Sequence, residues 1–329
     1  METVNLGNTG LKVSQIGLGT AALGRPGYMN LGHGKDLKGK TAVQDMRQQA
    51  HQMFDLAYEQ GILYYDTARS YGKGEDFLAE WINIRGYSDV IIGSKWGYIY
   101  TAEWQTTAKQ HEVKDHSINN LNRQLAESTG LLGEHLDLYQ IHSATLETGV
   151  LDDQLIEDRL WEIKRSGIKI GLTLSGANQA EILHKALTKE RDGLLIFDSV
   201  QATFNVLEQS AGSALMKAHE MGLGVIVKEG LANGRLTQRN TFEEDQDCLK
   251  LLSELAQKYD TGTDAIALAY VLEQPWSDTV LSGATTIAQL KANCDAGKLT
   301  LEETDEKRLS ACARDSESYW NTRSKLEWT

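Results

Sequence analysis

Four polar residues of the kinds used in proton transfer stand at or near the ends of short apolar runs. Asp66 and Lys95 close two such runs, His142 closes a third, and Tyr71 follows Asp66 in the same loop. Taken singly, each has an ordinary structural explanation, such as a buried ion pair or a core histidine. Their placement at successive run ends indicates one shared site.

Together these side chains suit the reduction of a carbonyl group. A hydride that reaches the carbonyl carbon leaves an alkoxide, which needs a proton at the same moment. Tyr71 is the expected donor, and a nearby ammonium should lower its pKa from the usual value of about 10. Lys95 would be that ammonium and Asp66 would keep it charged, while His142 would orient the carbonyl oxygen.

The elements that must position these residues follow an alternating pattern. Eight apolar or β-branched runs are predicted as strands, and each is followed by a segment with helical periodicity. The runs are residues 15–18, 63–66, 90–94, 136–142, 169–174, 199–202, 224–227 and 279–282. Eight such units, with no linker between the halves, predict a single (β/α)8 TIM barrel domain over residues 1–329. Its functional face would be the C-terminal end of the strands.

Two local patterns precede or compete with the barrel. Residues 4–14 predict a β-hairpin that turns at Asn8-Thr9-Gly10. The run GLGTAA at 17–22, with Asp36 about twenty residues on, matches the glycine pattern of a dinucleotide-binding turn. That turn requires a helix that starts at it, and the glycines and proline of residues 24–34 predict no helix there. The doubly wound alternative is therefore disfavoured.

Composition excludes several classes of partner. The chain has 33 Lys and Arg against 46 Asp and Glu, a formal net charge of −13. Such a surface repels phosphate backbones and anionic lipids, so neither nucleic acid nor membrane is an expected partner. No apolar run approaches the length of a membrane span, and no leader opens the chain. Three cysteines without disulfide or metal-ligand spacing predict a cytoplasmic protein with no metal site.

The run DTARSYGKGE at 66–75, with Lys95 and His142 downstream and GLGT at 17–20 upstream, resembles the aldo-keto reductase superfamily. The likeness extends from the opening hairpin to Asn293. Members of that family are (β/α)8 barrels that bind an extended nicotinamide cofactor, usually NADPH, without a Rossmann domain. The resemblance implies that Tyr71 is the general acid, with Lys95 and Asp66 as its tuning pair and His142 as the orienting group.

The resemblance also implies cofactor contacts. Ser175 and Gln201 stand where similar proteins hold the nicotinamide carboxamide, although Gly176 replaces the usual Asn. The run 228–235 resembles the loop that covers the pyrophosphate, and Lys228 replaces an aromatic residue that stacks on the nicotinamide in many relatives. The expected cofactor-binding residues are Gly19, Thr20, Asp66, Ser175, Gln201, Lys228, Gly230, Leu231, Gly234, Arg235, Gly283, Thr285, Gln289 and Asn293.

NADPH is the expected cofactor, and NADH stays open. Several family members place a Lys or Arg against the 2′-phosphate, and those positions here are Gly283 and Gln289. Charge-assisted contacts are the strong ones, so their loss weakens the case for NADPH. Arg235 in the neighbouring loop is a candidate replacement, and a solvated loop arginine is the alternative.

Aromatic residues on the loops are expected to wall the substrate pocket, namely Tyr28, Trp96 and Tyr98, or else to pack those loops onto the barrel. The leading interpretation is NAD(P)H-dependent reduction of a small-molecule aldehyde or ketone. An NAD-dependent sugar or polyol dehydrogenase and a cofactor-sensing regulatory subunit are the alternatives, because a fold alone does not decide function. No sequence feature indicates an oligomeric state.

Overall fold

A computed structural model describes all of residues 1–329, and eight parallel strands in it close into a barrel. Around the barrel the strands follow the order β12-β13-β14-β3-β4-β5-β8-β9. Their bounds are β3 Ile16–Gly19, β4 Tyr64–Asp66, β5 Ile91–Trp96, β8 Leu136–Ala144, β9 Lys169–Leu174, β12 Ser199–Thr203, β13 Gly224–Lys228 and β14 Thr279–Ser282. The eight predicted strands and the (β/α)8 barrel are thus confirmed, with β5 and β8 each ending two residues later than predicted.

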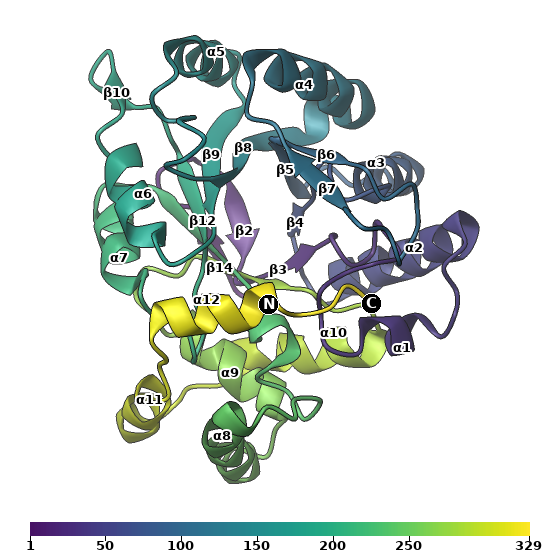
Figure 1. The fold of residues 1–329 in the computed structure, drawn as a ribbon, viewed down its shortest axis with the longest axis vertical. Helices are drawn as coiled ribbons and strands as arrows, with labels where there is room; N and C mark the ends of the chain where they lie inside the picture. The colour runs from purple at the N-terminus through teal and green to yellow at the C-terminus, as the bar shows by residue number, and fades with distance from the viewer.

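Helices form a ring outside the strands (Figure 1). The α-helices are α1 His33–Leu37, α2 Val43–Glu59, α3 Gly74–Arg85, α4 Ile118–Leu132, α5 Gln154–Arg165, α6 Gln179–Ala186, α7 Gly212–Glu220, α8 Gln246–Lys258, α9 Thr263–Leu272, α10 Ile287–Cys294, α11 Glu303–Ser310 and α12 Ser316–Ser324. The short 3-10 helices are η1 Gly133–His135, η2 Ala232–Gly234, η3 Glu243–Asp245 and η4 Asp295–Lys298. Two small antiparallel strand pairs lie outside the barrel, namely β6 Tyr98–Tyr100 with β7 Glu112–Lys114 and β10 Glu190–Arg191 with β11 Leu194–Leu195. None of the helices is both long enough and apolar enough to cross a bilayer.

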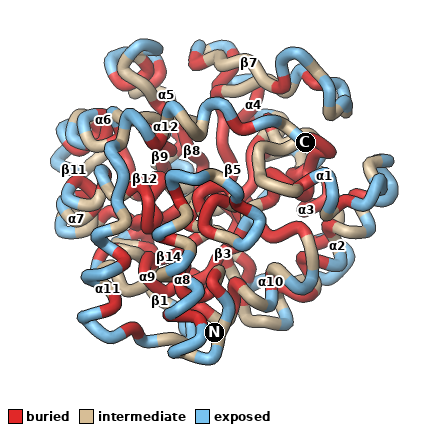
Figure 2. Tube along the Cα trace, turned by 60° about the horizontal axis from the view of Figure 1, so that its bottom comes forward, coloured by how far each residue is buried: buried red, intermediate tan, exposed pale blue.

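Helix α5 illustrates how the sequence forms these outer elements. The Asp153 side chain accepts hydrogen bonds from the backbone amides of Leu155 and Ile156, which caps the N-terminus. Basic residues occupy the last turn, where they oppose the negative end of the helix dipole. The buried side of the helix carries Leu160 and Trp161, which belong to the main hydrophobic core. In Figure 2 the buried residues gather in the strands and on the inner sides of the helices.

The predicted N-terminal hairpin is present as β1 (Thr3–Asn5) and β2 (Lys12–Ser14), and it closes the N-terminal end of the barrel. Leu6 lies at its turn and packs with Tyr64, Leu138 and Ile226 in a separate buried cluster. A Cβ atom on Gly224 would lie 2.4 Å from Leu6 Cγ, so the hairpin sits directly on the start of β13. With this end plugged, only the C-terminal end of the barrel is left open for a site.

The glycine-rich segment after β3 contains one surprise. The expectation that no helix forms there is wrong for α1, a five-residue helix whose N-cap residue Gly32 has a φ of 80°. Glycine reaches this left-handed conformation without strain, so the chain can turn into a helix immediately after it. No helix starts at the GLGTAA turn itself, and that turn belongs to the barrel rather than to a doubly wound sheet.

Replacing Leu6 by Ala should lower the free energy of unfolding by about 2–5 kcal/mol, because the hairpin plug loses buried contacts and leaves a cavity. Urea denaturation followed by circular dichroism measures this change. Leu155→Ala is the matched control, since Leu155 is 63% exposed and its removal should cost less than about 0.5 kcal/mol. Equal losses in the two variants would show that the plug does not stabilise the barrel.

Candidate active site

A cavity of about 520 Å³ opens at the C-terminal ends of the strands. Its wall includes Asp66, the last residue of β4, and Tyr71 in the loop that follows, and it extends to Gln289 and Asn293 on α10. Loops after β3, β13 and β14 supply the rest of the lining. The volume lies in the usual range of small-molecule and cofactor sites.

A buried ion pair joins Asp66 and Lys95 below this cavity. The Lys95 ammonium donates to the Asp66 carboxylate and, over 2.9 Å, to the Thr67 carbonyl oxygen. Asp66 Oδ1 also accepts from Gln201 Nε2 at 2.8 Å. Burial lowers the pKa of Lys95, and the charge of Asp66 opposes that shift. The pair therefore fixes both side chains in one arrangement.

Tyr71 lies over this ion pair, with Lys95 Nζ 4.8 Å from its ring centroid. Burial raises the pKa of Tyr71 well above its usual value, and the Asp66 charge adds to the rise. The expected lowering by Lys95 does not hold, because Asp66 compensates the ammonium and the ring is enclosed. Tyr71 is consequently protonated at neutral pH, the state that a proton donor requires.

His142 is placed beside Tyr71 by strand β8. The two rings meet edge to face at 5.5 Å, and Tyr98 contacts the other part of the His142 ring at 4.9 Å. Its Nδ1 lies 3.4 Å from Ser70 Oγ. Burial lowers the pKa of His142 well below its usual value, and the charge of Lys95 adds to the effect. The imidazole is thus neutral and carries one N–H that can donate to an oxygen.

Arg25 is a neighbour of the site that the sequence did not indicate. Its buried guanidinium pairs with Glu112 at 2.8 Å and donates to the Ser70 carbonyl at 3.0 Å. The guanidinium carbon lies 5.3 Å from the Tyr71 ring centroid, and its charge opposes the rise in the Tyr71 pKa. The segment Gly24-Arg25-Pro26-Gly27 has no periodicity from which this contact could be read.

Lys228, at the end of β13, lines the cavity and is held by two hydroxyl groups. Its Nζ donates to Ser175 Oγ at 3.0 Å and to Thr203 Oγ1 at 2.7 Å. Burial lowers the pKa of Lys228 to about 8. Ser175 itself is not among the lining residues, and its hydroxyl is hydrogen-bonded to the Lys228 ammonium.

The cavity wall has the polar groups that an extended nicotinamide cofactor needs. Asn233 Oδ1 and Asn293 Oδ1 are buried without a hydrogen-bond partner, which is costly unless a ligand supplies a donor. Gln201 uses Nε2 on Asp66 and makes no hydrogen bond through its oxygen, so that oxygen can accept from a carboxamide. A Cβ atom on Gly283 would meet nothing closer than 3.7 Å. These residues fit the dinucleotide.

Most of the predicted site residues line this one cavity. They are Gly19, Tyr28, Asp66, Tyr71, Gln201, Lys228, Gly230, Leu231, Gly234, Gly283, Thr285, Gln289 and Asn293. Lys95, His142 and Tyr98 lie behind or beside them through the contacts described above. The lining also includes Asp36 and Arg239, which the barrel interpretation had not assigned to the site. The only sequence signal for Asp36 was the rejected dinucleotide-binding pattern.

Trp96 and Thr20, like Ser175, are not among the residues that line the cavity. Trp96 is fully buried in the hydrophobic core against His116, because successive strand residues point to opposite faces and Lys95 occupies the inward position. Thr20 is fully buried, and its backbone amide donates to the Asp66 carbonyl at 2.8 Å. Trp96 is therefore not a wall of the pocket, whereas the assignment of Thr20, whose hydroxyl is buried without a hydrogen-bond partner, stays a prediction.

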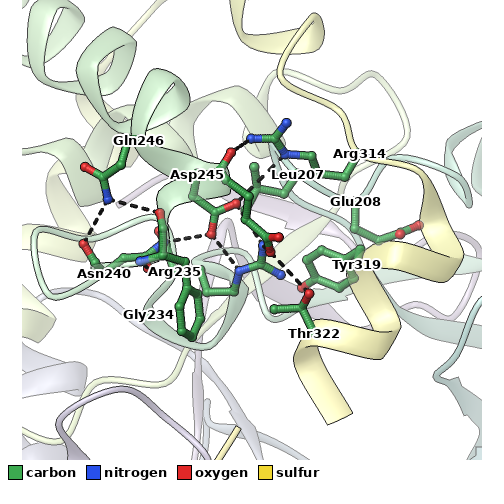
Figure 3. Close-up of polar contacts among 12 residues, drawn as sticks. Leu207, Glu208, Gly234, Arg235, Asn240, Asp245, Gln246, Arg314, Tyr319 and Thr322 are labelled. Atoms are coloured by element: carbon green, nitrogen blue, oxygen red, sulfur yellow. Dashed lines mark hydrogen bonds and ion pairs between the residues drawn. The ribbon is translucent and has the colours of Figure 1, made fainter. Parts of the chain in front are cut away.

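Arg235 is likewise not available to a ligand. Figure 3 shows its guanidinium between Asp245 and Tyr319, and the side chain is only 1% exposed. Nε and Nη2 each donate to Asp245 at 2.8 Å, and the guanidinium carbon lies 5.3 Å from the Tyr319 ring centroid. The suggestion that Arg235 contacts a 2′-phosphate is wrong, since its charge is already neutralised by a buried carboxylate.

The depressed pKa of Lys228 predicts a pH-dependent stability. The folded chain releases this proton near pH 8 and the unfolded chain near pH ~10.4, so folding becomes more favourable as pH rises between these values. The free energy of unfolding of the parent, minus that of Lys228→Met, should rise by up to about 3 kcal/mol between pH 8 and 10.5. Urea denaturation of both proteins across this pH range measures the difference. Lys250→Met, an exposed control, should show no such trend. If this difference between the parent and Lys228→Met did not change with pH, the lowered pKa of Lys228 would be contradicted.

Comparison with known proteins agrees with this geometry. The Aldo/keto reductase family model matches residues 15–314. An uncharacterized oxidoreductase of Bacillus subtilis, YrpG, is 25% identical over 92% of this chain and 93% of its own, and the NADH-specific methylglyoxal reductase of Escherichia coli is 24% identical over 93% and 96%. The solved structure of aldo-keto reductase AKR11C1 from Bacillus halodurans (holo form) superposes with a TM-score of 0.74 at 24% identity, covering 95% of this chain and 97% of its own. Because the family model spans most of its length, the chain belongs to the aldo/keto reductase family, the nicotinamide-dependent oxidoreductases that act on carbonyl compounds.

Proposed function

We propose that this protein reduces aldehydes or ketones to alcohols and that Tyr71 donates the proton. The observation that carries the proposal is the position of Tyr71 in the cavity wall, above the Asp66–Lys95 ion pair and edge to face with His142. Asp66 and Tyr71 come from β4 and the loop after it, Lys95 comes from β5 and His142 from β8, so the four groups are brought together by three neighbouring strands of the barrel.

A bound nicotinamide cofactor supplies the hydride that forms the new C–H bond. Tyr71 then gives its hydroxyl proton to the former carbonyl oxygen, and the resulting phenolate is reprotonated from solvent. The transfer is favourable because an alkoxide is a stronger base than a phenolate, even one whose pKa is raised by burial. The ammonium of Lys95 offsets the negative charge left on Tyr71.

His142 acts on the same oxygen before the proton moves. Its pKa is lowered by burial and by the Lys95 charge, so the ring stays neutral and presents one N–H. Donation from this N–H would hold the carbonyl oxygen near Tyr71 and stabilise the charge that develops there. Ser70, close to Nδ1, and Tyr98, which packs on the ring edge, keep the imidazole in place.

Aromatic side chains at the mouth of the site favour a small carbonyl compound with an apolar or aromatic substituent. Tyr28 lines the cavity, and Trp328 near the C-terminus packs against it at 6.1 Å. Thr329 and Tyr28 exchange two backbone hydrogen bonds, which join the C-terminal segment to the loop after β3. Flat apolar walls of this kind bind rings and alkyl groups well.

The proposed cofactor is a reduced nicotinamide dinucleotide. NADPH was expected from the family resemblance, but the positions that supply a basic residue in several relatives are Gly283 and Gln289 here. Arg235, the candidate replacement, is paired with Asp245. One relative bears the name NADH-specific methylglyoxal reductase. These observations make NADH the cofactor to test beside NADPH.

Replacing Tyr71 by Phe should lower turnover of an aromatic aldehyde by about 10²–10⁴-fold, the usual contribution of a positioned proton donor. The loss of nicotinamide absorbance with NADH and, separately, NADPH measures turnover. Cofactor binding, followed by protein fluorescence, should stay within twofold of the parent value. Tyr58→Phe is the matched control, because Tyr58 bonds Asp89 at the surface and is remote from the cavity.

The outcomes separate the competing functions. Unchanged turnover in Tyr71→Phe would refute the role of Tyr71. Tight cofactor binding by the parent with no turnover across a broad carbonyl panel would favour the cofactor-sensing subunit. Oxidation of sugars or polyols with NAD that is much faster than carbonyl reduction would favour the dehydrogenase.

A further inference from the structure

Asp36 occupies an unusual position in the cavity wall. It lies in α1, in the loop that follows β3, and its side chain is only 12% exposed. The Arg239 guanidinium donates to both of its oxygens, at 2.7 and 2.6 Å. Gln289 Nε2 donates to Oδ2 at 2.9 Å, and Thr285 Oγ1 lies 3.4 Å from the same atom. Three separate loops thus meet at one carboxylate.

The end of the cofactor that reaches Asp36 follows from the direction of the cavity. The reacting ring must lie against Tyr71, where the proton donor is. The adenosine half of an extended dinucleotide then lies at the opposite end of the lining, against Thr285, Gln289 and Asn293. Asp36 is bonded to the first two of these residues, so it faces the adenosine ribose.

We propose that Asp36 selects NADH over NADPH by accepting a hydrogen bond from the adenosine ribose and by excluding a 2′-phosphate. The inference rests on the proposed function, since it places the reacting ring at Tyr71. In Rossmann-type dinucleotide sites, a carboxylate pairs with the ribose 2′-hydroxyl and an arginine accommodates the 2′-phosphate, and the same chemistry applies to a ribose bound in a barrel. Here the carboxylate is Asp36 and the arginine is Arg239, and they pair with each other. The arginine is therefore not free to bind a 2′-phosphate.

Charge at this end of the cavity opposes a phosphate group. The wall carries the carboxylates of Asp36 and Asp264 and one guanidinium, that of Arg239. Burial disfavours ionisation of Asp36, but hydrogen bonds from Arg239 and Gln289 outweigh it and keep the pKa of Asp36 below its usual value. A 2′-phosphate would bring about two further negative charges against an ionised carboxylate. The one guanidinium at this end, that of Arg239, already donates to both oxygens of Asp36.

The neutral donors that bind phosphates at helix starts are also occupied. Gln289 Oε1 accepts from the amides of Thr285 at 2.9 Å and Thr286 at 3.1 Å. Thr286 Oγ1 in turn accepts from the Gln289 amide at 3.3 Å, which completes a capping box at the start of α10. The amides of Thr285, Thr286 and Gln289 and the Gln289 side chain are therefore satisfied within the chain. The group left to contact the ribose at this end is the Asp36 carboxylate, which can only accept hydrogen bonds.

The test measures binding without turnover. Quenching of tryptophan fluorescence gives the dissociation constants of NADH, NADPH, ADP-ribose and 2′-phospho-ADP-ribose at one ionic strength. The parent should bind each ligand that lacks the 2′-phosphate at least about tenfold more tightly than its phosphorylated partner. Asp36→Asn should cut this preference about tenfold, chiefly by strengthening NADPH binding, because Arg239 and Gln289 are released. Asp247→Asn removes an exposed carboxylate outside the cavity and should leave the preference within about twofold of the parent. Asp264→Asn removes a cavity carboxylate that makes no hydrogen bond to Gln289, and it should change the preference less than Asp36→Asn does.

Each result bears on the proposal. A parent that binds NADPH as tightly as NADH, or an Asp36→Asn variant with the parent preference, would overturn it. An equal effect of Asp264→Asn would show that a diffuse field, not Asp36, sets the preference. If Asp36→Asn does not fold, a parent that binds 2′-phospho-ADP-ribose as tightly as ADP-ribose would still overturn the proposal. Failure of all four ligands to bind would refute the proposed function instead.

Discussion

The buried ion pair between Asp66 and Lys95 is the interaction on which the site depends. Two charges removed from water are stable only when their remaining hydrogen-bonding groups are satisfied. The Thr67 carbonyl and Gln201 Nε2 do this here, and these partners come from β4 and β12, on different sides of the barrel. The pair is therefore stable only inside the closed barrel, and the closed barrel is what aims it at Tyr71.

Positive charge gathers at the end of the cavity that holds Tyr71. Arg25, Lys95 and Lys228 surround the ring of Tyr71 and the bottom of the cavity. Asp66 and Glu112 compensate two of these cations, so Tyr71 keeps its proton while positive charge remains near the oxygen that becomes an alkoxide. A buried, protonated tyrosine in a field of paired cations suits a donor that must release its proton only when a stronger base appears.

The opposite end of the cavity has the reverse character. Asp36 and Asp264 outnumber the single guanidinium of Arg239, and the amides at the start of α10 are bonded to Gln289. One cavity thus carries cations near Tyr71 and carboxylates near the start of α10. The loop after β3 contributes to both ends, through Arg25 and through Asp36, so in the proposed function this single glycine-rich segment would link proton transfer to cofactor choice.

Sequence alone was enough to predict the barrel and the hairpin, because period-2 and period-3.6 patterns are local properties. It also grouped the four proposed catalytic residues, because residues at strand ends can be read locally. It could not assign Arg25 or Asp36, which lie in a loop without periodicity and acquire partners 87 and 203 residues away. It also misplaced Trp96 and Arg235, whose side chains are buried away from the cavity. The packing of strands and loops decides the direction of each side chain. It also decides which oppositely charged residue pairs with it. Those contacts exist only in the folded chain, so tertiary structure decided them.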